Sequence, residues 1–157
     1  MSGGSIKSRN GVTAEQALSD YWNTGSKSNK KEIARVLGQK GQYASEEKYA
    51  NRYADEREKS NQKVIDNYKQ NPNAWKSDYD YVTRTQKSRS EYVEEGRQTY
   101  KNLQDNTLNM ASADVAKRMG YNISGAGGST ASALNNVMGK SNADKLRELV
   151  RSSAKNR

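Results

Sequence analysis

The chain has 157 residues, of which 27 are Lys or Arg and 18 are Asp or Glu, so its net charge at neutral pH is +9. It contains no Cys and no His, which excludes disulfides, Ser–His–Asp and Cys–His catalysis, and the commonest zinc ligands. Val, Ile and Leu number only 19 and Phe is absent, but ten Tyr and two Trp indicate an ordered chain with small cores.

The first predicted elements form an N-terminal helical module over residues 13–44. A flexible basic arm, residues 1–12, precedes this module. Thr13, with a Gln three positions later, forms a capping box and predicts the start of a helix. We expect Asn29 to cap a second helix, which ends at Gly38 because Gly readily adopts the left-handed conformation that follows a helix.

A long helical hairpin is predicted over residues 45–109. Ser45 and the acidic residues after it start its first helix, because carboxylates favour the N-terminal end of the helix dipole. That helix is polar on all sides over residues 55–63, which is typical of helices that cross solvent between packed ends. Pro72, the single Pro of the chain, ends it. A second helix follows, with a break expected near residues 85–90, and runs antiparallel to the first.

A C-terminal helical module is predicted over residues 110–157, built of three short helices and a basic tail. Ser112, Ser129 and Ser141 each stand where a hydroxyl caps the start of a helix. The glycine-containing loop 121–128 lies between the first two helices and leaves room for a short hairpin or wing. No segment shows the alternation of a strand, so the predicted class is all-α.

A seven-residue pattern occurs in both end modules. Residues 32–38 and 114–120 each read acid, β-branched apolar, Ala, base, any residue, long apolar, Gly. A loop and a Ser follow each copy, as in the helix-turn-helix motif of DNA-binding proteins. The loops, residues 39–44 and 121–128, are longer than the ~3–4-residue turn of that motif. The predicted fold is therefore all-α, with two small basic helix-turn-helix-like end modules joined by a long neutral helical hairpin.

The positive charge is concentrated at the two ends of the chain. Residues 1–44 carry a net charge of +4 and residues 110–157 carry +5, whereas residues 45–109 hold 12 basic and 12 acidic side chains. Basic side chains neutralise phosphates, and hydroxyl and amide groups at a helix start reach phosphates or base edges. The predicted nucleic-acid-binding residues are Lys30, Lys31, Arg35, Lys40, Lys117, Arg118, Ser129, Thr130, Ser132, Asn135, Lys140, Lys145, Arg147 and Arg151.

Aromatic residues recur along the hairpin and have three interpretations. They form the hairpin core, a protein–protein surface, in which Tyr and Trp are enriched, or stacking platforms for single-stranded nucleic acid. Helical spacing and the neutral surroundings favour the first two over the third. The candidate partner-interface residues are Tyr49, Tyr53, Tyr68, Trp75, Tyr79, Tyr92 and Tyr100.

These patterns together predict a basic, non-enzymatic nucleic-acid-binding accessory protein. DNA is favoured over RNA, and duplex DNA is the favoured partner. A phage or other mobile element is a compatible source. The alternative is a protein-interaction or virion-associated structural protein, or an inhibitor that docks on a nucleic-acid-handling machine. No catalytic residue, metal ligand or cofactor is predicted. The apolar runs are too short for a membrane span, so we expect no membrane contact and a cytoplasmic location, or a virion-associated one for a phage protein. The thin cores predict a homo-oligomer or a larger protein assembly.

Overall fold

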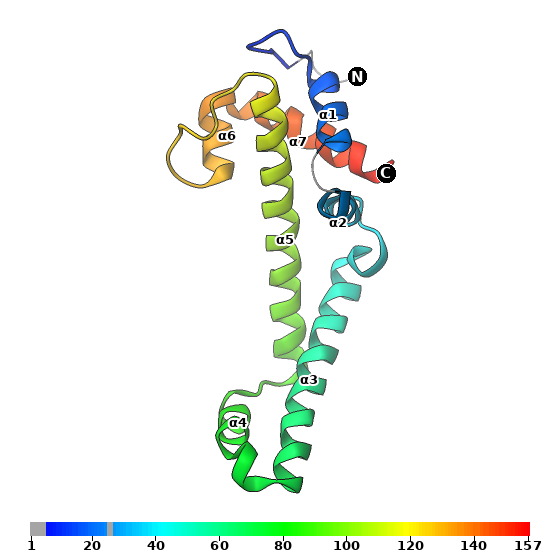
Figure 1. Ribbon diagram of the computed structural model, residues 1–157, viewed down its shortest axis with the longest axis vertical. Helices are drawn as coiled ribbons and strands as arrows, with labels where there is room; N and C mark the ends of the chain where they lie inside the picture. Colours follow the sequence, from blue (N-terminus) through cyan, green and yellow to red (C-terminus); the bar gives the residue numbers. More distant parts are fainter. Residues whose placement is uncertain (1–5, 25–26) are drawn as a thin grey trace. The chain divides into compact units, whose positions relative to one another are not determined.

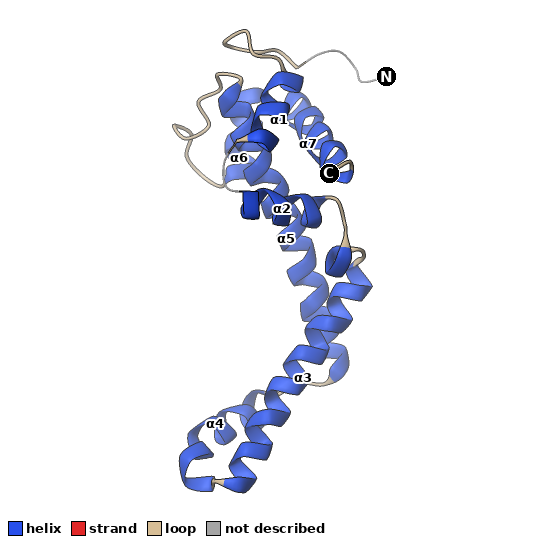
Figure 2. Ribbon diagram, turned by 45° about the vertical axis from the view of Figure 1, so that its right-hand side comes forward, coloured by secondary structure: helices blue, strands red, loops and turns tan. Residues whose placement is uncertain are grey.

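The computed structural model describes residues 6–24 and 27–157 (Figure 1). Within these ranges it contains seven α-helices, one 3-10 helix and no strand (Figure 2). The elements are α1 (Ala14–Asn23), α2 (Lys27–Leu37), η1 (Gly41–Tyr43), α3 (Glu46–Gln70), α4 (Pro72–Thr85), α5 (Arg89–Arg118), α6 (Thr130–Met138) and α7 (Lys140–Lys155). The predicted all-α class is confirmed for the described residues. None of these helices combines the length and the apolar character needed to cross a membrane.

Three of the predicted helix starts are confirmed by their caps. The Thr13 hydroxyl accepts a hydrogen bond from the Gln16 main-chain N–H at 3.1 Å, and the Gln16 side chain accepts one from the Thr13 N–H at 2.9 Å. The hydroxyls of Ser45 and Ser129 each accept a hydrogen bond from the N–H three residues later. These bonds satisfy donors that the first turn of a helix leaves unpaired.

The stop at Pro72 and the later break are also confirmed. α3 ends at Gln70, and Pro72 is the first residue of α4, where its missing N–H is no loss. The Asn71 side chain accepts a hydrogen bond from the main-chain N–H of Ala74 at 3.4 Å and so caps α4. α4 then ends at Thr85, and α5 begins after a short connection.

Three other predicted caps are wrong. α2 has already begun before Asn29. Ser112 lies within α5 and is fully buried. No Gly or Pro interrupts residues 97–119, so the helix continues through this position. Ser141 lies in the first turn of α7, whose cap position is held by Gly139 with a φ of 83°. A capping side chain marks a helix start only where the preceding chain leaves the helical conformation.

The chain divides into two compact units. Unit 1 comprises residues 1–41 and 102–157, and unit 2 comprises residues 42–101. α5 contributes its first part to unit 2 and the remainder to unit 1. Unit 1 thus contains both basic end segments and holds 15 Lys and Arg against 7 Asp and Glu, whereas unit 2 holds 12 against 11.

Unit 1 has one apolar core, to which α1, α2, α6, α7 and the last part of α5 all contribute. α2 and α7 approach closely at Gly38, where an added Cβ would lie 2.9 Å from the carbonyl oxygen of Ala154. The largest fully buried side chains are those of Tyr21, Leu37, Ser112, Val115, Met119, Leu134, Leu146 and Val150.

The chain just before α1 is bound to unit 1 rather than free. The N–H of Arg9 donates to the carbonyl of Met119 at 2.9 Å, and the Asn10 amide donates to the carbonyl of Arg118 at 3.1 Å. The last carbonyls of a helix lack partners within it, so this segment caps the C-terminal end of α5. The described part of the predicted flexible arm therefore has a defined position, and residues 1–5 of that arm lie outside the described residues.

In unit 2 the first part of α5 lies antiparallel to α3 (Figures 1 and 2). Small residues allow the two helices to approach, since a Cβ added at Gly96 would lie 2.8 Å from the Cα of Ala50. The Tyr100 hydroxyl donates to the carbonyl of Tyr43 at 2.8 Å in the adjacent core. The core is narrow, and it is built largely of Ala, Gly and Tyr.

Ion pairs balance six of the twelve basic residues of unit 2. Arg97 pairs with Glu47 at 2.7 Å, and Arg89 pairs with Asp55 at 2.6 Å, both between α5 and α3. Further pairs join Lys101 with Glu46, Arg52 with Glu56, Lys76 with Asp80, and Lys87 with Glu95. The near-zero net charge of unit 2 therefore reflects close pairing of opposite charges as well as nearly equal numbers of them.

Candidate nucleic-acid interface

A pocket of about 380 Å³ opens on the surface of unit 1. Residues of α1 and α2 and the chain after each of α2 and α7 line it. Five of its seven lining residues are basic and none is acidic; they are Trp22, Lys30, Lys31, Ala34, Arg35, Lys40 and Arg157. The four predicted phosphate-binding residues of the N-terminal segment are therefore brought together in one place.

Trp22 forms an apolar wall of this pocket and is held rigidly. Its indole Nε1 donates to the hydroxyl of Ser153 at 2.8 Å, and that hydroxyl donates to the carbonyl of Val150 at 2.8 Å. The Tyr21 ring contacts it edge to face, with ring centres 5.0 Å apart. The guanidinium of Arg157 lies over the indole, 5.1 Å from its centre. Packing and hydrogen bonds thus fix the orientation of the ring.

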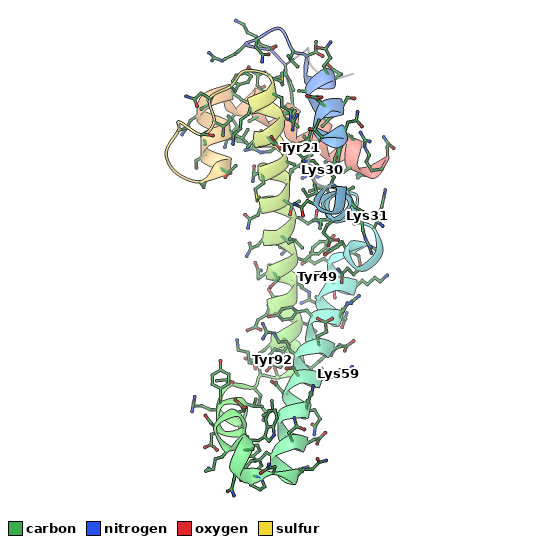
Figure 3. All side chains as sticks on the ribbon, viewed as in Figure 1. Tyr21, Lys30, Lys31, Tyr49, Lys59 and Tyr92 are labelled. Atoms are coloured by element: carbon green, nitrogen blue, oxygen red, sulfur yellow. The ribbon has the colours of Figure 1, made fainter. Side chains whose placement is uncertain are left out.

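Lys30 differs from the other cations of the pocket because its charge is directed inward. Its ammonium nitrogen lies 3.5 Å from the centre of the Tyr21 ring (Figure 3) and 4.0 Å from a carboxylate oxygen of Asp114. Burial lowers the pKa of Lys30, although Asp114 opposes that shift. Burial, together with Asp114, raises the pKa of Tyr21 to about 12. The charge of Lys30 is therefore partly satisfied within the unit.

The remaining four cations of the pocket form no ion pair with an acidic side chain among the described residues. Lys31 (Figure 3) and Arg35 are exposed on α2 and form no ion pair there. The Lys40 ammonium donates to the main-chain carbonyl of Arg157. A hollow lined by one sign of charge concentrates its electric field and attracts ions of the opposite sign. The site is therefore suited to an anion.

The two adjacent basic residues near the end of α5 have different surroundings. Arg118 pairs with Asp20 at 3.2 Å and with Asp114 at 3.7 Å, and its side chain is 27% exposed. Lys117 is exposed and makes no ion pair within the described part of the chain. Of these two predicted residues, only Lys117 presents an unbalanced charge to solvent.

Arg147 lies inside unit 1, where its guanidinium joins three elements. Its Nε donates to the Asn109 side chain at 2.8 Å, and its Nη1 donates to the side-chain oxygens of Asn135 and Asp144, each at 2.9 Å. Its Nη2 donates to the carbonyl of Ala131 at 3.2 Å. The side chain is only 14% exposed. Both predicted contacts, Arg147 and Asn135, are therefore engaged in holding α5, α6 and α7 together.

The other predicted residues of the C-terminal segment do not line the pocket. Lys140 pairs with Asp144 at 2.8 Å, and Arg151 pairs with Glu148 at 3.1 Å. Lys145 is half-buried on α7, and Ser129, Thr130 and Ser132 are exposed around the start of α6. The structure thus brings the N-terminal candidates together and leaves the C-terminal ones dispersed over unit 1.

The chain matches no protein-family model, no curated protein and no solved structure. Within the described residues no cluster of three or more acidic side chains stands ready to hold a metal ion. The basic pocket is therefore the feature from which a function is inferred.

The predicted partner-interface residues of unit 2 fall into two groups. Tyr92 and Tyr100 are buried, and Tyr49 lies against the Tyr100 ring, which fits the hairpin-core interpretation. Tyr68 and Tyr79 stack with ring centres 4.0 Å apart at the α3–α4 end. Those two rings, and the side chains of Tyr53 and Trp75, are half-exposed.

Three residues of the pocket, Trp22, Ala34 and Arg157, are absent from the predicted set. In the sequence Trp22 is one more apolar residue on the inner face of the first helix, and Arg157 belongs to a basic tail. They lie near opposite ends of the chain, so no local spacing relates them. The packing of the end of α7 beside α1, where the Trp22 indole donates to Ser153, brings Arg157 over the indole.

Proposed function

We propose that the protein is a non-enzymatic nucleic-acid-binding protein and that unit 1 binds the phosphate backbone, with duplex DNA as its first target. The observation that carries this proposal is the gathering of Lys31, Arg35, Lys40 and Arg157 around one pocket that no acidic side chain lines. In unit 2, by contrast, six of the twelve basic residues are paired, and acidic residues are almost as numerous as basic ones. Cations without an acidic side-chain partner on a common surface displace the counterions of a nucleic acid, which supplies salt-sensitive affinity.

The helix-turn-helix-like segment around α6 is proposed to add contacts to the phosphate backbone only. The exposed Ser129, Thr130 and Ser132 surround the start of α6, where main-chain N–H groups favour a phosphate. The amide oxygen of Asn135 is already held by Arg147, so base reading through Asn135 is not part of the proposal. Binding is expected to depend on charge and strand geometry more than on base sequence.

A salt titration tests this function. Fluorescence anisotropy with a labelled duplex, at roughly 50 and 200 mM salt, gives the slope of log affinity against log salt. The double replacement Lys31→Ala with Arg35→Ala is expected to weaken binding to every duplex and to make the slope shallower by up to about 2, because each lost phosphate contact contributes about 0.9.

The matched control removes the same charge from unit 2. Lys59 and Lys63 are exposed and form no ion pair in the described ranges, so Lys59→Ala with Lys63→Ala loses no visible contact. This pair is expected to leave the slope nearly unchanged. Absence of binding by the unaltered protein at low salt, or an equal effect of the two double variants, refutes the proposal.

A second candidate function is protein association through the α3–α4 end of unit 2. The stacked Tyr68 and Tyr79 rings are half-exposed there, Tyr81 is 59% exposed, and Val82 is the buried residue of α4. Exposed aromatic residues are enriched in protein interfaces. Sedimentation over a range of concentrations tests this candidate: association that Tyr81→Ser weakens supports it, and a monomer throughout rules out self-association by this surface.

A further inference from the structure

We propose that the pocket beside Trp22 holds one unpaired nucleotide of a nucleic-acid strand, with its base stacked on the indole and its phosphate among the surrounding cations. This inference rests on the proposed function and assigns a more specific ligand to the same site. It concerns a strand end or an extruded nucleotide, because a base within a duplex has no free face for stacking.

The size and the wall of the pocket fit this ligand. The volume of about 380 Å³ is within the ~300–1,000 Å³ typical of small-molecule sites. Trp22 is 9% exposed and lines the pocket with an indole whose orientation is fixed by the hydrogen bond to Ser153. Stacking on such a ring is tolerant of base identity, since every base has an aromatic face.

Arg157 marks the position at which a flat group stacks. Its guanidinium lies 5.1 Å from the centre of the indole, and the residue is otherwise exposed. A guanidinium is planar and stacks on aromatic rings much as a base does. In the proposed complex the base takes this place on Trp22, and Arg157 turns to the phosphate.

The charges around the pocket supply the second half of the recognition. Lys31, Arg35 and Lys40 surround the aromatic wall, and no acidic residue lines the pocket. Lys30 is not assigned to the phosphate, because its ammonium is directed to the Tyr21 ring and Asp114. An acidic peptide would satisfy the cations, but its carboxylate side chains have no ring to place on Trp22. A nucleotide uses both features.

Tryptophan fluorescence tests the inference in the folded full-length chain. The protein has two Trp residues, so Trp75→Phe leaves Trp22 as the only indole. This variant is titrated with a duplex that ends in one unpaired thymidine and with the same duplex carrying an abasic residue there. We expect strong quenching of Trp22 emission by the first and little by the second, because only the thymidine has a base to stack.

A second variant measures the stacking contribution. Trp22→Leu is expected to reduce the affinity for the thymidine overhang by roughly 5- to 150-fold, the range for loss of one base–aromatic stack. Its affinity for the abasic duplex is expected to stay unchanged. Circular dichroism verifies that the variant is folded; if it is not, the quenching experiment alone decides.

Three results would overturn the inference. Equal quenching by the thymidine and abasic duplexes shows that the base does not reach Trp22. Equal quenching by free thymidine monophosphate shows that the site does not require a strand, and equal quenching by polyglutamate assigns it to acidic peptides. If the two duplexes quench equally but duplex binding is still salt-dependent, only the nucleotide inference fails and the proposed function stands. If the unaltered protein binds no DNA even at low salt, the proposed function and the nucleotide inference both fail.

Discussion

The ammonium nitrogen of Lys30 lies 3.5 Å from the centre of the Tyr21 ring, so this cation is directed toward the interior of unit 1. Lys31, the next residue along α2, is exposed and has no ion pair among the described residues. Two consecutive lysines of the same predicted binding set are thus expected to have different roles. Lys30 belongs mainly to the packing of α1 and α2, and Lys31 to the binding surface.

The first prediction separates these two roles. Lys30→Met keeps the side-chain stem and removes the charge. It is expected to weaken duplex binding less than Lys31→Ala, and to change the free energy of unfolding by less than about 1 kcal/mol, since loss of the cation–ring contact is offset by relief of a half-buried ammonium. Anisotropy and urea unfolding measure the two quantities. An equal loss of affinity in both variants would place Lys30 in direct contact with phosphate.

The second prediction concerns the Arg147 network. Arg147→Ala leaves acceptors of Asn109, Asn135 and Ala131 without their donor, so the free energy of unfolding should fall by about 2–3 kcal/mol. Arg147→Lys should also be destabilising, because an ammonium cannot reproduce the planar fork that reaches these acceptors. Urea unfolding measures both. Arg151→Ala, which removes only a surface pair with Glu148, is the control and should have an effect within about 0.5 kcal/mol. A fully stable Arg147→Lys protein would contradict the assigned role.

The third prediction tests the close approach of α3 and α5. Gly96→Ala should lower the free energy of unfolding by roughly 1–3 kcal/mol, because the new Cβ would lie 2.8 Å from the Cα of Ala50 and the main chain must move. Gly127→Ala is the matched control, since nothing lies within 4 Å of its added Cβ. That change should be neutral or stabilising by up to about 1 kcal/mol. Thermal unfolding that ranks the two variants in the opposite order would show that Gly96 is not tightly packed.

The fourth prediction concerns acid stability of unit 2. Hydrogen bonds from Arg97 and Lys87 lower the pKa of Glu47 and Glu95, respectively, below the ordinary value of 4.5. The folded chain therefore binds fewer protons at these groups than the unfolded chain. Their contribution to stability is present above pH 4.5 and is lost as the pH falls below that value.

The acid effect should depend on the partner arginine. Arg97→Gln is expected to show a smaller difference in urea midpoint between neutral pH and roughly pH 3 than the unaltered protein does, since the pKa of Glu47 moves back toward its ordinary value. Lys59→Gln, a change of an exposed residue without an ion pair in the described ranges, should keep the full difference. An unchanged pH dependence in Arg97→Gln would mean that other carboxylates determine acid stability.

Much of the secondary structure follows from the sequence because its causes are local. The caps at Thr13, Ser45 and Ser129 act within one turn of helix, and Pro72 acts on its immediate neighbours, so residue identity and spacing were sufficient to predict them. Ser112 shows the limit of this reasoning. It has the side chain of a cap, but it lies in the interior of α5 because the surrounding residues continue the helix.

The candidate site was only half predictable. Charge segregation in the sequence identified Lys31, Arg35 and Lys40, since net charge depends on composition alone. The tertiary structure decided that Arg157 and Trp22 complete the pocket and that Arg147 is enclosed in a hydrogen-bond network. Whether a basic side chain is free or neutralised depends on residues far away in the chain, and these are brought near it only when the helices pack to bury their apolar faces.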